Sequence, residues 1–403
     1  MAEKQNVAMA RMTEGVIDRR TVLKLGAVAG TAAFLAACGT SGGSTEPSAS
    51  SADNTPSATL NWANWTYYLD VDAGVDTATA ETSESLRRFK KEYGTTVNYR
   101  EDLLDNDEFF GTIKAPLEAG QDTGWDLVTP TTWMAKKIID LGWAEKFDKS
   151  HMPNFVANLA DEFHGRAADP SNDYLAPWQS IMTGLGVNTK KTKRFTKVSG
   201  LWDPALKGKI SLLTELRDTT GLVMLGNGAD PSNPTRATFD AAIATLQAAI
   251  DSGQVRKITG NGYTELLIND SALAAIAWSG DVGIIQADKP ELEFIVPDEG
   301  GMYATDNLLI PKGAQHKYTA ELWIDFYYRP EIAAIVEAYV KYICPVKGVS
   351  VEITKIDPAL AANPLIFPSE ETKRRLHVWG SVSAEDQAYF DERFSAIVEG
   401  VSA

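Results

Sequence analysis

The chain has 403 residues, with 38 Lys or Arg against 54 Asp or Glu, and its formal net charge is −16 at pH 7. Such an acidic surface repels nucleic-acid phosphates, so a role in nucleic-acid binding is excluded. The chain has only two cysteines, and its four histidines lack metal-ligand spacing. We therefore predict no disulfide and no metal site.

The first 37 residues are typical of an export signal. Arg19 and Arg20 precede an apolar run that ends at Cys38 and is shorter than the roughly 20 residues that a membrane-spanning helix needs. A cysteine after small residues resembles the lipobox of bacterial lipoproteins, where the thiol is acylated and the preceding peptide is removed. We predict a twin-arginine signal peptide over residues 1–37, lipidation of Cys38, and a location on the extracytoplasmic face of the membrane.

Residues 39–57 are almost all small or polar and cannot build a core. Together with the lipidated cysteine they predict a flexible tether over residues 38–57. The remainder of the chain is too long for one ordinary core, and it is long enough for two lobes.

Strand and helix patterns alternate at the start of this remainder. A strand is expected over residues 59–64, a helix through residues 86–93 that stops at Gly94, and a strand over residues 95–99. Another short strand, residues 125–130, leads into a helix that ends at Gly142. This alternation predicts a largely parallel sheet covered by helices.

A second set of α/β elements begins near Gly184. Its clearest helix has apolar residues at helical spacing from Phe239 to Ile250. Two helices are expected near the end of this set, over residues 323–328 and 331–339. The expected strands of this set are residues 210–213, 274–278, 294–297 and 307–311.

Ligands of open α/β sheets bind just beyond the carboxyl ends of the strands. Aromatic and acidic residues recur at these ends, a combination that suits an organic cation: the carboxylate neutralises an ammonium group, and the aromatic face attracts it. The candidates found in this way are Trp65, Tyr68, Thr131, Trp133, Glu215, Asp218, Trp278, Asp281, Tyr303 and Asp306.

The motifs of common enzyme classes are missing from the sequence, including the Gly-x-Ser-x-Gly elbow, the phosphate loop and His-Glu-x-x-His. Glu215 and Asp218 are the one pair that suggests glycoside hydrolysis. An ion pair of Arg217 with either carboxylate is the simpler explanation for part of this trio.

Several short motifs follow one another in a specific order along the chain. They include Asn64-Trp65-Thr66-x-Tyr68, Trp125-Asp126-Leu127-Val128-x-Pro130, Trp278-x-Gly280, Pro297-x-Glu299-Gly300-Gly301, Asp306 and Tyr342-x-x-Pro345. With these motifs, the chain from about Leu60 to Ser381 resembles the bacterial spermidine/putrescine-binding proteins that serve ABC importers.

The resemblance implies the type II periplasmic-binding-protein fold, in which two α/β lobes are joined by crossing strands and close on a ligand in the cleft between them. On this basis lobe 1 is expected over residues 58–183 and 303–345, and lobe 2 over residues 184–302. Residues 346–403 are expected to form a helical segment that packs across the lobes.

The resemblance also assigns the polyamine contacts. Asp306 would hold a ligand ammonium group, and Asp281 matches a carboxylate of putrescine-selective members. Tyr67, Ala304 and Trp379 depart from the family pattern and leave the preferred amine open. The other positions that match polyamine contacts are Trp65, Tyr68, Thr131, Trp133, Glu215, Asp218, Trp278 and Tyr342.

We therefore expect a monomeric, lipid-anchored receptor that passes a polyamine to an ABC permease and has no cofactor or catalytic activity. Two alternatives stay open at this point. One is a receptor for another small solute, such as an amino acid derivative, a sugar or a metal. The other is an exported hydrolase that uses Glu215 and Asp218.

Overall fold

The computed structural model describes residues 54–402. The predicted signal peptide, Cys38 and most of the predicted tether lie outside the described residues. Between residues 54 and 402, no helix combines the length and the apolar character needed to cross a bilayer.

The first sheet has three parallel strands in the order β2-β1-β3. They are β1 (Thr59–Trp65), β2 (Thr96–Leu103) and β3 (Leu127–Val128). The sequence predicted all three, but β3 is shorter than the expected segment 125–130. Only Leu127 and Val128 pair with β1, and the chain soon reaches Pro130, which has no backbone N–H to donate to a neighbouring strand.

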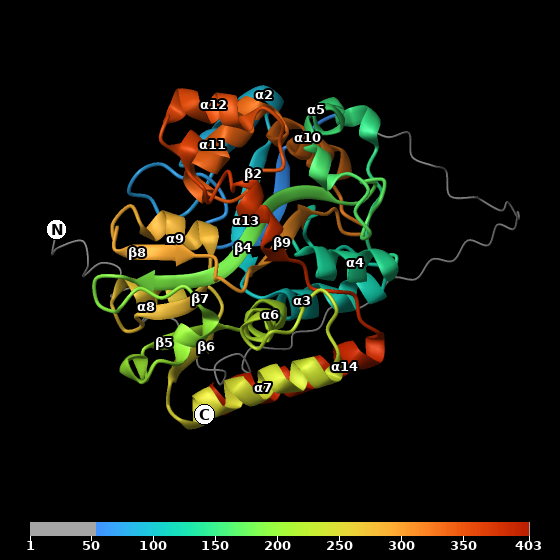
Figure 1. Cartoon of the computed structure of the whole chain (residues 1–403). Helices are drawn as coiled ribbons and strands as arrows, with labels where there is room; N and C mark the ends of the chain where they lie inside the picture. Colours follow the sequence, from blue (N-terminus) through green and yellow to red (C-terminus); the bar gives the residue numbers. More distant parts are fainter. Residues whose placement is uncertain (1–53, 403) are drawn as a thin grey trace, which may run out of the picture. The chain divides into compact units, whose positions relative to one another are not determined.

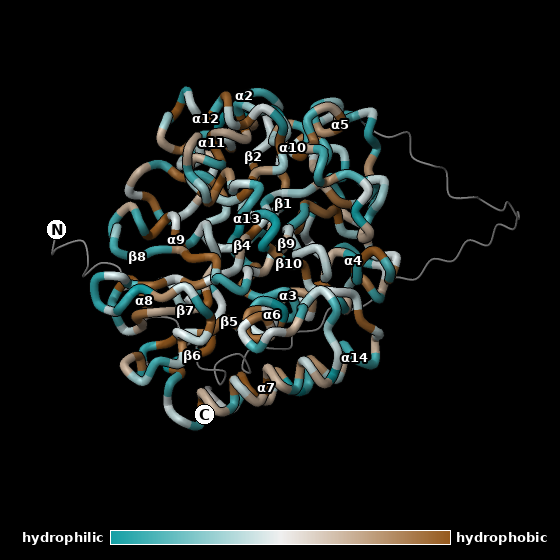
Figure 2. The backbone as a smooth tube through the Cα atoms, viewed as in Figure 1, coloured by the Kyte–Doolittle hydropathy of each residue, from teal (hydrophilic) through white to brown (hydrophobic). Residues whose placement is uncertain are grey.

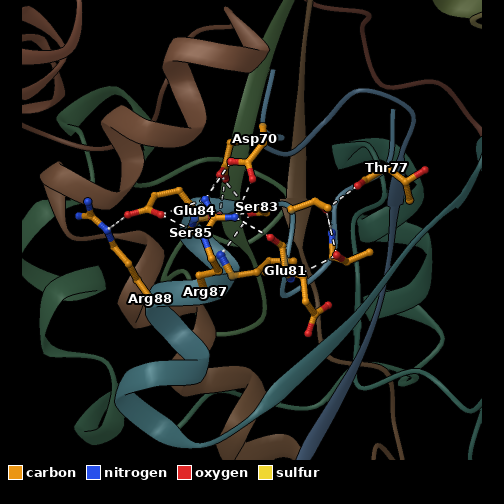
Figure 3. Close-up of polar contacts among 12 residues, drawn as sticks. Asp70, Thr77, Glu81, Ser83, Glu84, Ser85, Arg87 and Arg88 are labelled. Atoms are coloured by element: carbon orange, nitrogen blue, oxygen red, sulfur yellow. Dashed lines mark hydrogen bonds and ion pairs between the residues drawn. The ribbon is translucent and has the colours of Figure 1, made fainter. Parts of the chain in front are cut away.

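Helix α2 (Glu84–Tyr93) connects β1 to β2. Its N-cap is Ser83, and it ends at Gly94, which adopts the left-handed conformation with φ 74° as the sequence predicted. Buried Asp70 accepts hydrogen bonds from the Ser83 hydroxyl at 3.0 Å and from the backbone N–H of Ser85 at 3.1 Å (Figure 3). These bonds tie the segment after β1 to the start of the helix. Helices α3 (Asn106–Glu118) and α4 (Thr132–Asp140) follow β2 and β3.

The second sheet is mixed rather than largely parallel. Strand β4 runs antiparallel to β7, β8 and β9, whereas β5 runs parallel to β6 and β7. The order is β10-β9-β4-β7-β5-β6, with β8 also paired to β4. The strands are β4 (Ala176–Asn188), β5 (Ile210–Leu213), β6 (Val255–Thr259), β7 (Ala274–Trp278), β8 (Leu292–Ile295), β9 (Gly301–Leu308) and β10 (Leu376–His377).

Strands β4 and β9 connect the two sheets. The long strand β4 crosses the centre of the view in Figure 1 and is buried along its whole length. Beyond β9, Leu309 bridges to Val128 of the first sheet. The predicted α/β fold of two lobes with crossing strands is thereby confirmed. One correction is needed: β9 begins at Gly301 instead of residue 307, so Tyr303 and Asp306 lie within the strand.

Helix α7 (Arg236–Asp251) turns an apolar face into the buried core of the second lobe, and its alternating colours in Figure 2 mark its two sides. Helix α14 (Ala384–Ser402) lies along α7 (Figure 1) and also contacts β6. The buried residues of α7 are Phe239, Ala242, Ile243, Leu246 and Ala249. The other helices of this lobe are α6 (Leu216–Gly226), α8 (Tyr263–Ile268) and α9 (Ser279–Ile285).

The remaining helices pack mostly against the first lobe. There α12 (Val349–Ile356) contacts α11 (Pro330–Val340), and α10 (Lys317–Tyr327) contacts α5 (Pro153–Asn158). The segment 346–403 contacts both lobes. Its helix α12 contacts α11 in the first lobe, whereas its strand β10 pairs with β9 and its helix α14 contacts α7. The lobe boundaries stay a prediction. The helices are α5 (Pro153–Asn158), α10 (Lys317–Tyr327), α11 (Pro330–Val340), α12 (Val349–Ile356) and α13 (Glu370–Arg374), with 3₁₀ turns at Lys149–His151, Asp161–Phe163, Val198–Trp202, Pro204–Leu206 and Leu360–Ala362.

Candidate functional site

A cavity of about 1170 Å³ is lined by residues that follow strands of both sheets, by β9, and by parts of the segment 378–391. The structure brings all eleven predicted ligand contacts to this one cavity, whereas their part in binding stays a prediction. They are Trp65, Tyr68, Thr131, Trp133, Glu215, Asp218, Trp278, Asp281, Tyr303, Asp306 and Tyr342.

Asp306 lies on β9, opposite Gln179 of β4, and only 2% of its surface is exposed. Its Oδ2 accepts a hydrogen bond from the Tyr68 hydroxyl at 2.8 Å, and its Oδ1 accepts one from the Thr131 hydroxyl at 2.6 Å. Burial raises the pKa of Asp306 to about 7, although both hydrogen bonds act to lower it. The carboxylate is thus held in place by neutral donors.

Asp281 lies in the first turn of α9 and is also buried. Its Oδ1 accepts a hydrogen bond from the Tyr342 hydroxyl at 2.8 Å, and its Oδ2 accepts from the Tyr263 hydroxyl at 2.8 Å and Asn261 Nδ2 at 3.0 Å. Burial raises the pKa of this carboxyl, while the three donors act to lower it. The Tyr342 ring can approach because Gly280 has no side chain: a Cβ there would lie 2.3 Å from the ring.

Tyr263 and Asn261 are functional candidates that the sequence analysis missed. Both follow β6, a strand that the analysis did not identify. The composition of this segment could have indicated the strand, because Val255, Ile258 and Thr259 are β-branched residues, which favour strands.

Glu215 and Asp218 lie at the start of α6, where Glu215 is the N-cap. Asp218 Oδ2 accepts a hydrogen bond from the indole N–H of Trp278 at 2.7 Å. Burial raises the pKa of Asp218, and it raises that of Glu215 to about 7. For Glu215, the nearby positive charge of Arg217 opposes this shift, and the charge of Asp218 adds to it.

Arg217 lies between these carboxylates and the first lobe. Its Nη1 is 3.3 Å from Glu215 Oε1, which confirms the ion pair suggested by the sequence. Its guanidinium carbon is 3.5 Å from the centroid of the Trp133 ring. Trp133 belongs to α4, after the first sheet, and Arg217 to α6, after the second. The stacking therefore joins the two lobes across the cavity.

The aromatic side chains are held in fixed orientations. The rings of Tyr68 and Tyr342 meet edge to face with their centroids 5.1 Å apart, and the Trp65 indole N–H donates to the Thr129 carbonyl at 2.8 Å. Among the departures from the family pattern, Ala304 and Trp379 line the cavity. Tyr67 does not, and its left-handed φ of 59° places it in a turn after β1.

The geometry suits the binding of a small organic cation. Asp281 and Asp306 are buried, and their hydrogen-bond donors in the part of the chain that the structure describes are all neutral. A buried ionised carboxylate is unfavourable unless a cation compensates it. A ligand with ammonium groups would supply that charge, and the aromatic rings would pack against its apolar chain.

The profile of the bacterial extracellular solute-binding protein family matches residues 84–368, which is more than half of the chain. The spermidine/putrescine-binding periplasmic protein of Salmonella typhimurium is 28% identical over 353 residues, which cover 85% of this chain and 92% of that protein. Its namesake from Escherichia coli is 29% identical over 342 residues, covering 82% and 89%.

The fold is also similar to that of solved structures. The spermidine/putrescine ABC transporter substrate-binding protein of Streptococcus pneumoniae superposes with a TM-score of 0.68 at 21% identity, over 85% of this chain and 98% of that one. The extent of the sequence match and the shared two-lobed fold agree with each other. The chain belongs to the bacterial extracellular solute-binding proteins.

Proposed function

We propose that the protein captures a polyamine between its two lobes and delivers it to an ABC transporter permease. The observation that carries this proposal is the pair of buried carboxylates, Asp281 and Asp306, that face one aromatic-walled cavity without a cationic partner among residues 54–402. The relatives from Salmonella typhimurium and Escherichia coli are named as spermidine/putrescine-binding proteins, and this supports the same ligand class. The family implies a role in binding rather than catalysis, outside the cytoplasm.

Closure of the lobes on the ligand follows from the placement of the contacts. Tyr68 and Trp133 follow strands of the first sheet, while Asp218 follows β5 and Trp278 ends β7 in the second. A ligand that touches both sets binds the closed arrangement better than the open one, and this difference in affinity shifts the protein toward closure.

Calorimetry and thermal denaturation test the ligand class. We expect putrescine or spermidine to bind and to raise the melting temperature, because a ligand at 100 times its Kd stabilises the folded state by about 2.7 kcal/mol. 1,4-Butanediol is the matched control, since it keeps the four-carbon chain of putrescine but has no charge. Binding of the diol, sugars or amino acids in place of the amines would contradict the proposal.

We also propose that Cys38 is the lipid anchor and that the twin-arginine route exports the protein. Cys38→Ala is expected to release the folded protein from membranes or to leave it as unprocessed precursor, because no other residue would carry the lipid. Membrane fractionation of expressing cells measures this. Cys344→Ala, at the only other cysteine, should stay membrane-bound, and a processed Cys38→Ala protein in the membrane fraction would refute the anchor.

A further inference from the structure

Arg217 places an organic cation of the protein's own inside the cavity, against an aromatic ring. The Arg217 side chain is 10% exposed and its guanidinium carbon lies 3.5 Å from the centroid of the Trp133 ring. Cations attract an aromatic face when they lie within about 6 Å of its centroid. At 3.5 Å the guanidinium stacks on this face, so a ligand ammonium group cannot take the same position while Arg217 stays there.

Arg217 also compensates the acidic residues around it. Its Nη1 pairs with Glu215 at 3.3 Å, and its charge acts on Asp218 as well. The planar guanidinium can stack and form an ion pair at the same time, and it is more weakly hydrated than an ammonium group, so it suits a buried position. Glu215, Trp133 and Arg217 thus form a cation site that is already filled.

Asp218 also lines the cavity and accepts a hydrogen bond from the Trp278 indole, but the charge of Arg217 already acts on it. Two further acidic positions remain for the ligand. Asp306, with Tyr68 and Thr131, forms one of them, and Asp281, with Tyr263 and Tyr342, forms the other. No Lys or Arg donates to either carboxylate in the portion of the chain from 54 to 402. A ligand with two ammonium groups would satisfy both positions and leave Arg217 undisturbed.

We propose that Arg217 is a specificity-determining residue that occupies a third cation position between Trp133 and Glu215, and thereby favours diamines over triamines. The inference rests on the proposed polyamine function and deepens it. The third ammonium group of a triamine either shares Asp218 with Arg217, whose charge already acts on that carboxylate, or displaces Arg217 from both Trp133 and Glu215. A diamine avoids both penalties.

The test compares the Kd values of putrescine, a diamine, and spermidine, a triamine, by calorimetry. The wild-type protein is expected to bind putrescine more tightly. Arg217→Met keeps the length of the side chain but frees the Trp133 face and Glu215, so the ratio of the two Kd values should move about tenfold or more toward spermidine.

Arg100→Met is the matched control. Arg100 also lies over a tryptophan, 5.6 Å from the centroid of Trp125, and pairs with Asp102 at 2.8 Å, but neither it nor its partners line the cavity. This variant loses the same charge and the same kind of contact, and it should leave the ratio unchanged.

Arg217→Lys keeps the charge and loses the planar stacking, so we expect a ratio of the two Kd values between those of the wild type and Arg217→Met. If Arg217→Met does not fold, a shift of this ratio toward spermidine in Arg217→Lys tests the role of Arg217 instead. Tighter wild-type binding of spermidine, or an unchanged ratio in the Arg217 variants, would overturn the role of Arg217 while leaving the polyamine function intact. Failure of the wild-type protein to bind either amine would instead reject the proposed function, and with it this inference.

Discussion

Asp306→Asn is expected to weaken polyamine binding on the order of 30- to several-thousand-fold. The substitution keeps the volume of the side chain and removes the negative charge that would face a buried ammonium group. Loss of one partner of a buried, hydrogen-bonded charge pair costs roughly 2–5 kcal/mol. Calorimetry gives the change in Kd, and stopped-flow kinetics should place most of it in faster dissociation, because the pair forms after the first encounter.

Glu370→Gln is the control for this loss of charge. The Glu370 side chain is 78% exposed and pairs with Lys373 at 3.1 Å, and neither residue lines the cavity. Its removal should change Kd little, and the effect should shrink with added salt. An Asp306→Asn protein with wild-type affinity for both putrescine and spermidine would rule out the proposed site.

The same substitution is expected to stabilise the ligand-free protein at pH 8. The pKa of Asp306 rises from 3.8 to about 7 on folding because the group is buried. The folded protein therefore holds the proton more tightly than the unfolded chain does. The contribution of this proton to the free energy of unfolding is complete below pH 3.8, the unfolded pKa, and is lost as the pH rises to about 7, the folded pKa. A shift of this size corresponds to on the order of 4 kcal/mol. Asn removes the ionisation, so the melting temperature should increase more at pH 8 than at pH 5.

Asp270→Asn is a control for which we expect the opposite change in melting temperature. It forms ion pairs with Lys191 and Lys289, and their hydrogen bonds lower its pKa. Its stabilising effect is present above the unfolded pKa and is lost as the pH falls, so Asp270→Asn should lower the melting temperature at pH 8. A fall in the melting temperature of ligand-free Asp306→Asn at pH 8 would indicate a structural rather than a ligand-binding role for Asp306.

These two expectations for Asp306 have one physical origin. The folded protein holds the carboxylate where burial disfavours its charge, and its hydrogen-bond donors among residues 54–402 are the neutral hydroxyl groups of Tyr68 and Thr131. A bound ammonium group would compensate that charge. The position is therefore unfavourable for the free protein and favourable for the complex, as expected of a binding residue.

Local patterns in the sequence determined most of the elements that surround the cavity. The strands at 210–213 and 274–278 were predicted with their observed bounds, and Gly94 ends α2 as expected. These features depend on apolar periodicity and on the conformational freedom of glycine, which act over a few residues. The rule that ligands bind beyond strand ends then led to Trp65, Trp133 and Asp218.

Only the tertiary structure decided which distant residues meet. The early start of β9 depends on its pairing with β4 and β10, and the hydrogen bonds of Asp281 to Tyr263 and Tyr342 depend on how separate segments pack. The stacking of Arg217 on Trp133 joins residues 84 positions apart (217 − 133) from different lobes. Residue spacing carries no information about such contacts, because long-range packing, rather than local periodicity, brings these side chains together.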